Sequence, residues 1–195
     1  MRRTAAALFL LSFAASAGEV EDFRAAYKRN LPEPARKELI VALSRSNAPE
    51  VSFLLAKVQR EERGSVYLQA WIAKALSDHG APESLKVVAE MLADPRTAPA
   101  VALVAEQVLA QVSRPEGLAW LAAATQGAKR REIRDRIVWA LAANPNFGDA
   151  AFFRDRLVPK TERDWRVRAA AAAGLARLGD PGSLEAVRAA LAVED

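Results

Sequence analysis

The 195-residue chain contains no cysteine and a single histidine, His79. The absence of cysteine excludes disulfides, thiol catalysis and Cys-ligated metals, so packing alone must hold the fold together. The lone histidine leaves only carboxylates as further metal ligands, and the chain has no Asp-x-Asp-x-Asp calcium loop. We therefore expect no metal site and no cofactor.

An excess of either charge is also lacking, and the only long apolar run lies at the start. Arg2 and Arg3 precede the run 4–14, and Ala15-Ser16-Ala17 matches the small-x-small pattern of a signal-peptidase site. The run is too short for a comfortable membrane span. We expect a signal peptide over 1–17, cleavage after Ala17, and export to the periplasm or extracellular space as a soluble protein. A buried N-terminal helix is the alternative.

Removal of this leader leaves 178 residues, which is enough for one domain with a continuous core. The shortened chain has 26 basic and 24 acidic residues, a net charge of +2. Charges of both signs are interspersed, as on an ordinary soluble surface. This charge balance is too weak to indicate a nucleic-acid partner, and the expected export argues against one as well.

The clearest local pattern lies over 165–191. Val167, Leu175 and Leu178 fall on one face of a predicted helix. Gly179 supplies the left-handed residue that commonly ends a helix, and Pro181 suits the first turn of the next. This stretch predicts a helical hairpin.

The hairpin layout recurs along the chain with a period of 32–34 residues. Apolar residues stand four and eight positions before an anchor leucine and twelve after it, and a proline follows the anchor by six in four of five units. The anchors are Leu43, Leu76, Leu109, Leu141 and Leu175. Such self-similarity is the signature of stacked helix pairs. It predicts an all-α, right-handed α-solenoid of about five antiparallel helix pairs.

The repeat also gives the expected boundaries. First helices are expected at 34–46, 66–79, 98–112, 131–142 and 165–178, and second helices at 49–60, 82–93, 115–126, 148–158 and 181–192. The repeat domain then spans 34–195. The preceding extension, 18–33, is expected to hold a short helix over 22–31 whose Phe23, Ala26 and Tyr27 cover the open apolar end of the array.

Residues 167–181 carry a likeness to a known family. The motif is Val167-Arg168, an alanine run, Gly174-Leu175, and then Leu178-Gly179-Asp180-Pro181. It resembles the HEAT-repeat superfamily, specifically the short HEAT-like units also found in phycobilisome-lyase-type proteins. The resemblance covers about 34–192 and implies the fold, but such solenoids serve many functions. Tetratricopeptide repeats have a similar period, but their expected Trp, Gly-Tyr and late Pro positions are not met.

No group of residues amounts to a catalytic site. Ser77, Asp78 and His79 are adjacent, and adjacent residues point in different directions on a helix. We expect His79 to cap the end of its helix. The acidic pair Glu61-Glu62 lies in a linker and is expected to be solvated. Three glutamates follow helix-opening prolines, where a negative charge favours the helix dipole, and these are Glu50, Glu83 and Glu116.

The expected binding surface is the fourth unit together with the second helix of the third unit, which carries Trp120. Trp120 and Phe152 occupy equivalent positions on second helices, where they would form an exposed apolar stripe. Basic residues gather in the fourth unit, and they are Arg130, Arg131, Arg154 and Arg156. The alternatives are that this apolar column packs between neighbouring second helices and that the basic run is a solvated helix start.

The repeat, the leader and the lack of clustered catalytic residues favour an exported, non-enzymatic binding or scaffold module for a protein or peptide. One alternative is a lyase-type or cofactor-handling protein, which requires Arg154, Asp155 and Arg156 to converge in a pocket. A second is a nucleic-acid binder, which requires basic residues along one groove and salt-dependent binding. Self-association through the uncovered last helix is left open.

Overall fold

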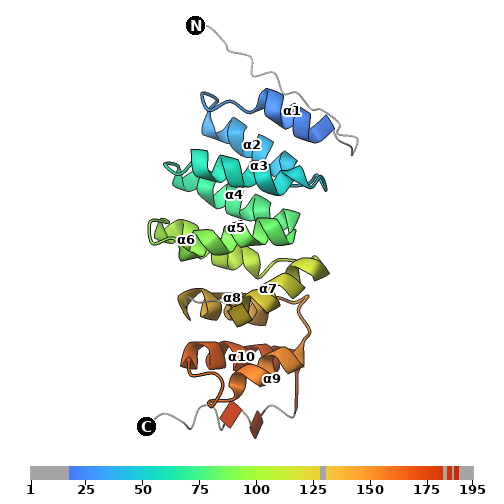
Figure 1. Cartoon of the computed structure of the whole chain (residues 1–195), viewed down its shortest axis with the longest axis vertical. Helices are drawn as coiled ribbons and strands as arrows, with labels where there is room; N and C mark the ends of the chain where they lie inside the picture. The colour runs from blue at the N-terminus through green and yellow to red at the C-terminus, as the bar shows by residue number, and fades with distance from the viewer. Residues whose placement is uncertain (1–17, 128–130, 182–183, 186, 189–195) are drawn as a thin grey trace, which may run out of the picture.

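The computed structural model describes residues 18–127, 131–181, 184–185 and 187–188. In these residues the chain forms ten α-helices and no strand, so the all-α prediction is confirmed. The helices follow one another along the long axis of the molecule, with α1 (Gly18–Ala26) at one end and α10 (Trp165–Leu178) at the other (Figure 1). The predicted signal peptide and much of the predicted helix 181–192 lie outside the described residues.

The other helices are α2 (Glu33–Leu43), α3 (Glu50–Glu61), α4 (Val66–His79), α5 (Pro82–Ala93), α6 (Pro99–Leu109), α7 (Pro115–Gly127), α8 (Arg131–Ala143) and α9 (Ala150–Leu157). Nine of the ten begin and end within three residues of the expected positions. The exception is α1, which was expected over 22–31. It begins earlier because Glu19 and Glu21 occupy its first turn, where acidic side chains stabilise a helix N-terminus.

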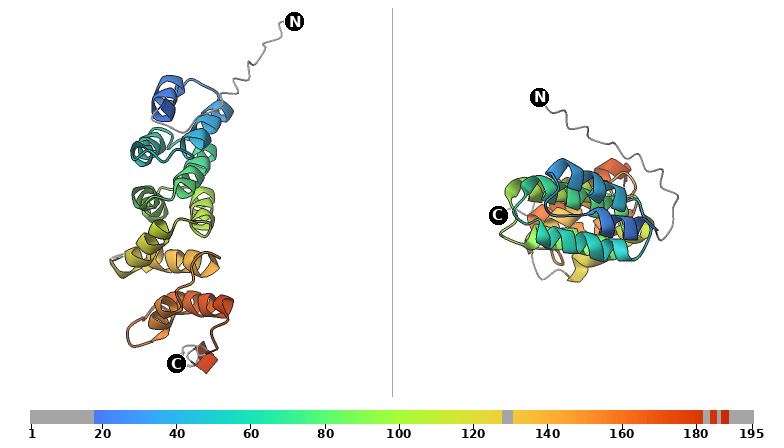
Figure 2. Two further views of the ribbon diagram at one scale, coloured as in Figure 1. Left: turned by 90° about the vertical axis from the view of Figure 1, so that its right-hand side faces the viewer. Right: turned by 90° about the horizontal axis from the view of Figure 1, so that it is seen from above.

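Consecutive helices pack into two rows. One row consists of α2, α4, α6, α8 and α10, and each helix in it contacts its neighbours in the row. The second row contains α3, α5 and α7, where α5 contacts both α3 and α7. The rows are joined by contacts between sequence neighbours, such as α3 with α4, α5 with α6, and α9 with α10. The turned view in Figure 2 shows the rows side by side. We call the row that starts with α2 the first-helix row.

The repeat anchors form the centre of the core. Leu43, Leu76, Leu109, Leu141 and Leu175 are each at most 2% exposed. Burial of a leucine side chain contributes about 1.5–3 kcal/mol, so these positions are a main source of stability in every unit. The periodicity of the sequence therefore reports the residues that are actually buried.

Two glycines end first helices as expected. Gly80 follows α4 with φ 66°, and Gly179 follows α10 with φ 64°. A left-handed residue lets the amide after the helix bond the last carbonyls. The Gly179 amide donates to the carbonyl of Ala176 at 3.1 Å, and the Gly80 amide donates to that of Leu76 at the same distance.

Buried ion pairs connect helices to the linkers between units. Glu62, expected to be solvated, is only 5% exposed, so that prediction was wrong. Its Oε1 accepts hydrogen bonds from Arg36 Nη1 and, at 2.6 Å, from the Tyr27 hydroxyl. Burial and the neighbouring Glu62 carboxylate raise the pKa of Tyr27 well above its ordinary value. The linker carboxylate thereby ties the segment after α1 to α2.

The fourth unit repeats this device with Glu162. Arg134, seven residues before its anchor as Arg36 is before Leu43, donates from Nη2 to Glu162 Oε1 at 2.7 Å. Arg168 Nη1 donates to the Glu162 backbone carbonyl at 3.1 Å. Arginines therefore hold the linkers in place from the same repeat position, seven residues before an anchor leucine. These arginines are Arg36, Arg134 and Arg168, and all three bond other groups of the protein.

Candidate functional site

The apolar stripe expected from Trp120 in the third unit to Phe152 in the fourth does not form an exposed surface. Phe152 is 7% exposed and packs edge-on against Phe147 and Phe153, with ring centroids 5.1 and 5.2 Å away. Trp120 is half-buried against the same core. The prediction that Phe152 lies at the surface was wrong, because Phe147, Phe153 and the Arg156 guanidinium cover its ring. Phe152 is therefore not available to a partner in this conformation.

The arginines of the fourth unit point to different places. Arg154 donates from Nε and Nη2 to the two carboxylate oxygens of Asp180, at 3.0 and 2.7 Å. Arg156 turns inward, donates to Thr125 Oγ1 at 2.6 Å, and stacks 3.5 Å above the Phe152 ring. Burial lowers the pKa of Arg156, because the charged guanidinium has lost water.

The remaining members of the predicted surface do not join them. Asp155 is exposed, so Arg154, Asp155 and Arg156 form no convergent polar pocket. Arg130 lies outside the described residues. Arg131 begins α8, and its side chain is likewise outside what the structure describes. The fourth-unit site is not assembled in the part of the chain that can be described.

His79 is the last residue of α4, but its side chain belongs to a buried polar cluster and does not cap the helix. The residue is 2% exposed, and its Nδ1 lies 2.8 Å from Ser84 Oγ. Ser84 Oγ in turn lies 2.8 Å from Ser52 Oγ. The imidazole thus joins α3, α4 and α5, whereas a capping role was expected. Burial, followed by the nearby positive charge of Arg114, lowers the pKa of His79.

This cluster has the residue types of a hydrolase but not its access. Ser52 is 6% exposed and Ser84 is fully buried, so no substrate reaches either hydroxyl. Three partners satisfy one another in the core, which is how buried polar groups are normally accommodated. Among the residues the structure describes, no three His, Asp or Glu side chains are placed to hold a metal ion.

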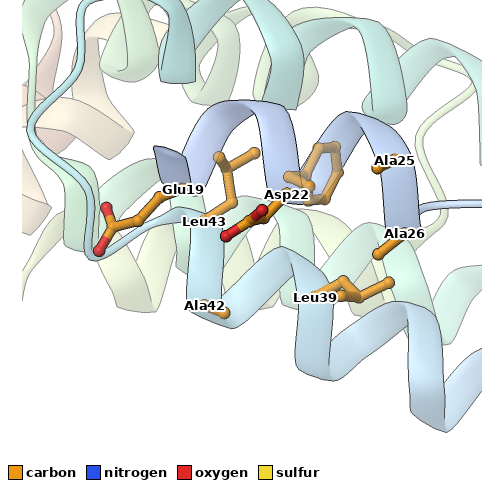
Figure 3. A pocket seen from close by; sticks show the side chains of 8 residues that line it. Glu19, Asp22, Ala25, Ala26, Leu39, Ala42 and Leu43 are labelled. Atoms are coloured by element: carbon orange, nitrogen blue, oxygen red, sulfur yellow. The ribbon is translucent and has the colours of Figure 1, made fainter. Parts of the chain in front are cut away.

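An open apolar pocket lies at the other end of the molecule, between α1 and α2 (Figure 3). Its volume is about 390 Å³. We call it the N-terminal groove. Its lining residues are Glu19, Asp22, Phe23, Ala25, Ala26, Leu39, Ala42 and Leu43. Figure 3 shows Leu43 rising from α2 toward α1, with Leu39 and Ala42 on the same helix.

The groove exists because the first-helix row begins at α2. Leu39 and Ala42 are half-buried. Their counterparts one repeat later, Ile72 and Ala75, are at most 1% exposed because α4 lies between α2 and α6. Within the described residues α2 has a row neighbour on one side only, and α1 covers it incompletely. No helix of the described ranges therefore covers the apolar face that a preceding row member would occupy.

The rim of the groove is acidic. Glu19 and Asp22 stand three residues apart on α1, so they share a face of that helix. Neither carboxylate forms an ion pair with any of the described residues. Glu21, in contrast, does not line the groove and pairs with Arg24 at 2.5 Å. Two carboxylates without an ion pair within the described residues therefore line the groove.

Other exposed apolar side chains are dispersed along the molecule. They are Phe53, Val66, Tyr67, Leu103, Trp139, Val158, Trp165 and Leu184. Single exposed apolar residues are normal on a protein surface. The N-terminal groove differs because several apolar side chains from two helices meet there around a cavity. Phe23 and Ala26 were expected to cover the array end; both line this opening, and Phe23 packs into the core beneath it.

No known protein-family model matches the chain, and neither does any curated protein.

The longest described helices, α4 and α10, have 14 residues each. A membrane span requires about 20. None of the helices in the described ranges is therefore long and apolar enough to cross a membrane.

Proposed function

We propose that the chain is a right-handed, HEAT-like solenoid that is exported and binds a protein or peptide without catalysing a reaction. Support for the solenoid comes from the 32–34-residue period, the two rows of helices and the glycine corners at Gly80 and Gly179. In such arrays each pair contacts only its neighbours, so both ends require a cover.

The observation that carries the binding role is the N-terminal groove. Leu39 and Ala42 present apolar surface at a position that is fully buried in the next unit. Open apolar surface bordered by polar side chains is typical of interaction sites. The fourth unit gives less support to the lyase-type or cofactor-handling alternative, because Arg154 bonds Asp180 and Arg156 bonds Thr125.

Site-specific photo-crosslinking tests this proposal. A benzophenone amino acid replaces Ala26, an exposed residue of the groove, in the full chain expressed with its leader. The control places it at Ala123, which is exposed on α7. We expect a discrete protein adduct from position 26 that is absent from position 123 and is lost with Leu39→Asp. Equal adducts at both positions, or none at position 26, would contradict binding through the groove.

A further inference from the structure

The N-terminal groove has the geometry of a missing helix. Leu39, Ala42 and Leu43 follow the i, i+3, i+4 spacing of a helix-packing stripe. The same three positions of α4 are Ile72, Ala75 and Leu76, all at most 1% exposed in the packed row. The stripe on α2 therefore has the composition of a face that receives a helix, but within the described residues that helix is absent.

The second wall of the groove allows a helix to approach closely. Ala25 and Ala26 of α1 and Ala42 of α2 are small, and the distance between packed helices depends on the side chains at their contact. Phe23 is 5% exposed and supplies a large apolar surface at the base. A volume of about 390 Å³ lies within the usual range for binding pockets, about 300–1,000 Å³.

The charges select among helices. Glu19 and Asp22 line the groove and have no ionic partner among the described side chains. A helix with lysine or arginine beside its apolar stripe would neutralise them, whereas an acidic helix would meet like charges. Rim charges of this kind contribute more to partner choice than to total affinity.

We infer that the N-terminal groove binds a basic amphipathic α-helix of a partner protein, which occupies the vacant position at the head of the first-helix row. The inference rests on the proposed protein-binding function and specifies the kind of partner. Apolar side chains of that helix contact Leu39, Ala42 and Leu43, and its basic side chains face Glu19 and Asp22. The helix-in-groove arrangement extends the array by one element.

The test uses two synthetic, fluorescein-labelled peptides of about 16 residues, roughly four helical turns. Both have leucines at i, i+3, i+4 and i+7 on an alanine background, with lysine on the polar face of one and glutamate on that of the other. Fluorescence anisotropy with the full chain is expected to show binding of the lysine peptide at least about tenfold tighter than the glutamate peptide. Added salt should reduce the difference.

Variants locate the binding. Glu19→Lys combined with Asp22→Lys should weaken the lysine peptide about tenfold and strengthen the glutamate peptide. Glu21→Lys is the matched control, because it changes the same charge on the same helix outside the groove, and it should alter binding less than about twofold. Leu39→Asp places a charge on the half-buried apolar wall of the groove, and it should abolish binding of both peptides.

Four outcomes would overturn the inference. Equal affinity for the two peptides contradicts the selection by charge. Binding that occurs only after Arg2 and Arg3 are changed to glutamate would show that the chain's own leader fills the groove. A dimer in sedimentation that Leu39→Asp dissociates would identify a second copy as the occupant. If neither peptide binds but position 26 still crosslinks a partner, the helical ligand is wrong while the proposed function survives.

Discussion

Replacement of Gly174 by alanine tests the packing of α9 against α10 most sharply. A methyl group at this position would lie 2.6 Å from Cε1 and Cζ of the Phe153 ring. Ordinary carbon contacts lie at about 3.5–4.0 Å, so the ring would have to move by roughly 1 Å. Phe153 is fully buried and meets Phe147 and Phe152 edge-on at 5.5 and 5.2 Å, which leaves little room for that movement.

Two effects of opposite sign determine the result. Alanine is favoured over glycine inside a helix by about 1 kcal/mol. Overpacking of a well-filled core costs about 1–3 kcal/mol, and the confined Phe153 ring places Gly174→Ala at the upper end of that range. We therefore expect the free energy of unfolding to fall by about 2 kcal/mol, although the same substitution stabilises an isolated helix.

Urea unfolding followed by circular dichroism measures this change. Gly148→Ala is the control, because a Cβ there meets no atom within 4 Å and the change should stay within about 0.5 kcal/mol. In a Phe153→Leu background, which frees space, Gly174→Ala should become neutral or stabilising, so the two sites couple by about 2 kcal/mol. A wild-type background in which Gly174→Ala stabilises by about 1 kcal/mol would refute the contact.

Three further predictions follow from buried groups. The pKa of His79 is lowered in the folded chain, so the unfolded chain binds a proton more readily than the folded chain does. The free energy of unfolding should therefore fall as the pH drops below about 6.5, by at most ~1.4 kcal/mol per pH unit. His79→Gln should remove this part of the pH dependence. Glu62→Gln should destabilise by about 3 kcal/mol because Arg36 stays buried, whereas Glu61→Gln, at a partly exposed site, should cost less than ~0.5 kcal/mol. Arg156→Ala should lower the unfolding free energy by ~2 kcal/mol through lost stacking and hydrogen bonds, with chemical denaturation as the measurement in each case.

Helix positions could be predicted because they depend on local periodicity. The anchors Leu76 and Leu175 repeat at a fixed distance from glycine corners, and both helices begin and end where the pattern places them. Gly179 has the left-handed conformation expected of it for the same local reason. Such features need no knowledge of what packs across the array.

The site residues could not be predicted in this way, because their surroundings depend on distant segments. Glu62 lies in a polar linker, and only the approach of Arg36 and Tyr27 explains its burial. His79 at a helix end looks like a cap until α3 brings Ser52 beside it. Phe152 shares a column with Trp120, but Phe147, which stands six residues after Leu141 where the other units have a proline, covers the Phe152 ring.

The N-terminal groove was missed for a further reason. The sequence shows that Phe23 and Ala26 belong near the array end, but complete coverage depends on the length and placement of α1. With nine residues, α1 leaves Leu39 and Ala42 half-buried. An opening of this kind is a property of how two helices meet and has no motif of its own.

Amide hydrogen exchange of the full chain, with and without the lysine peptide, tests the binding site most directly. Binding in the N-terminal groove should slow exchange in α1 and α2, residues 18–26 and 33–43, and leave α7 and α9 unchanged. Protection confined to 115–127 and 150–157 would instead place the binding surface in the third and fourth units, around Trp120 and Phe152. That result, or no protection anywhere at saturating peptide, would contradict binding in the N-terminal groove.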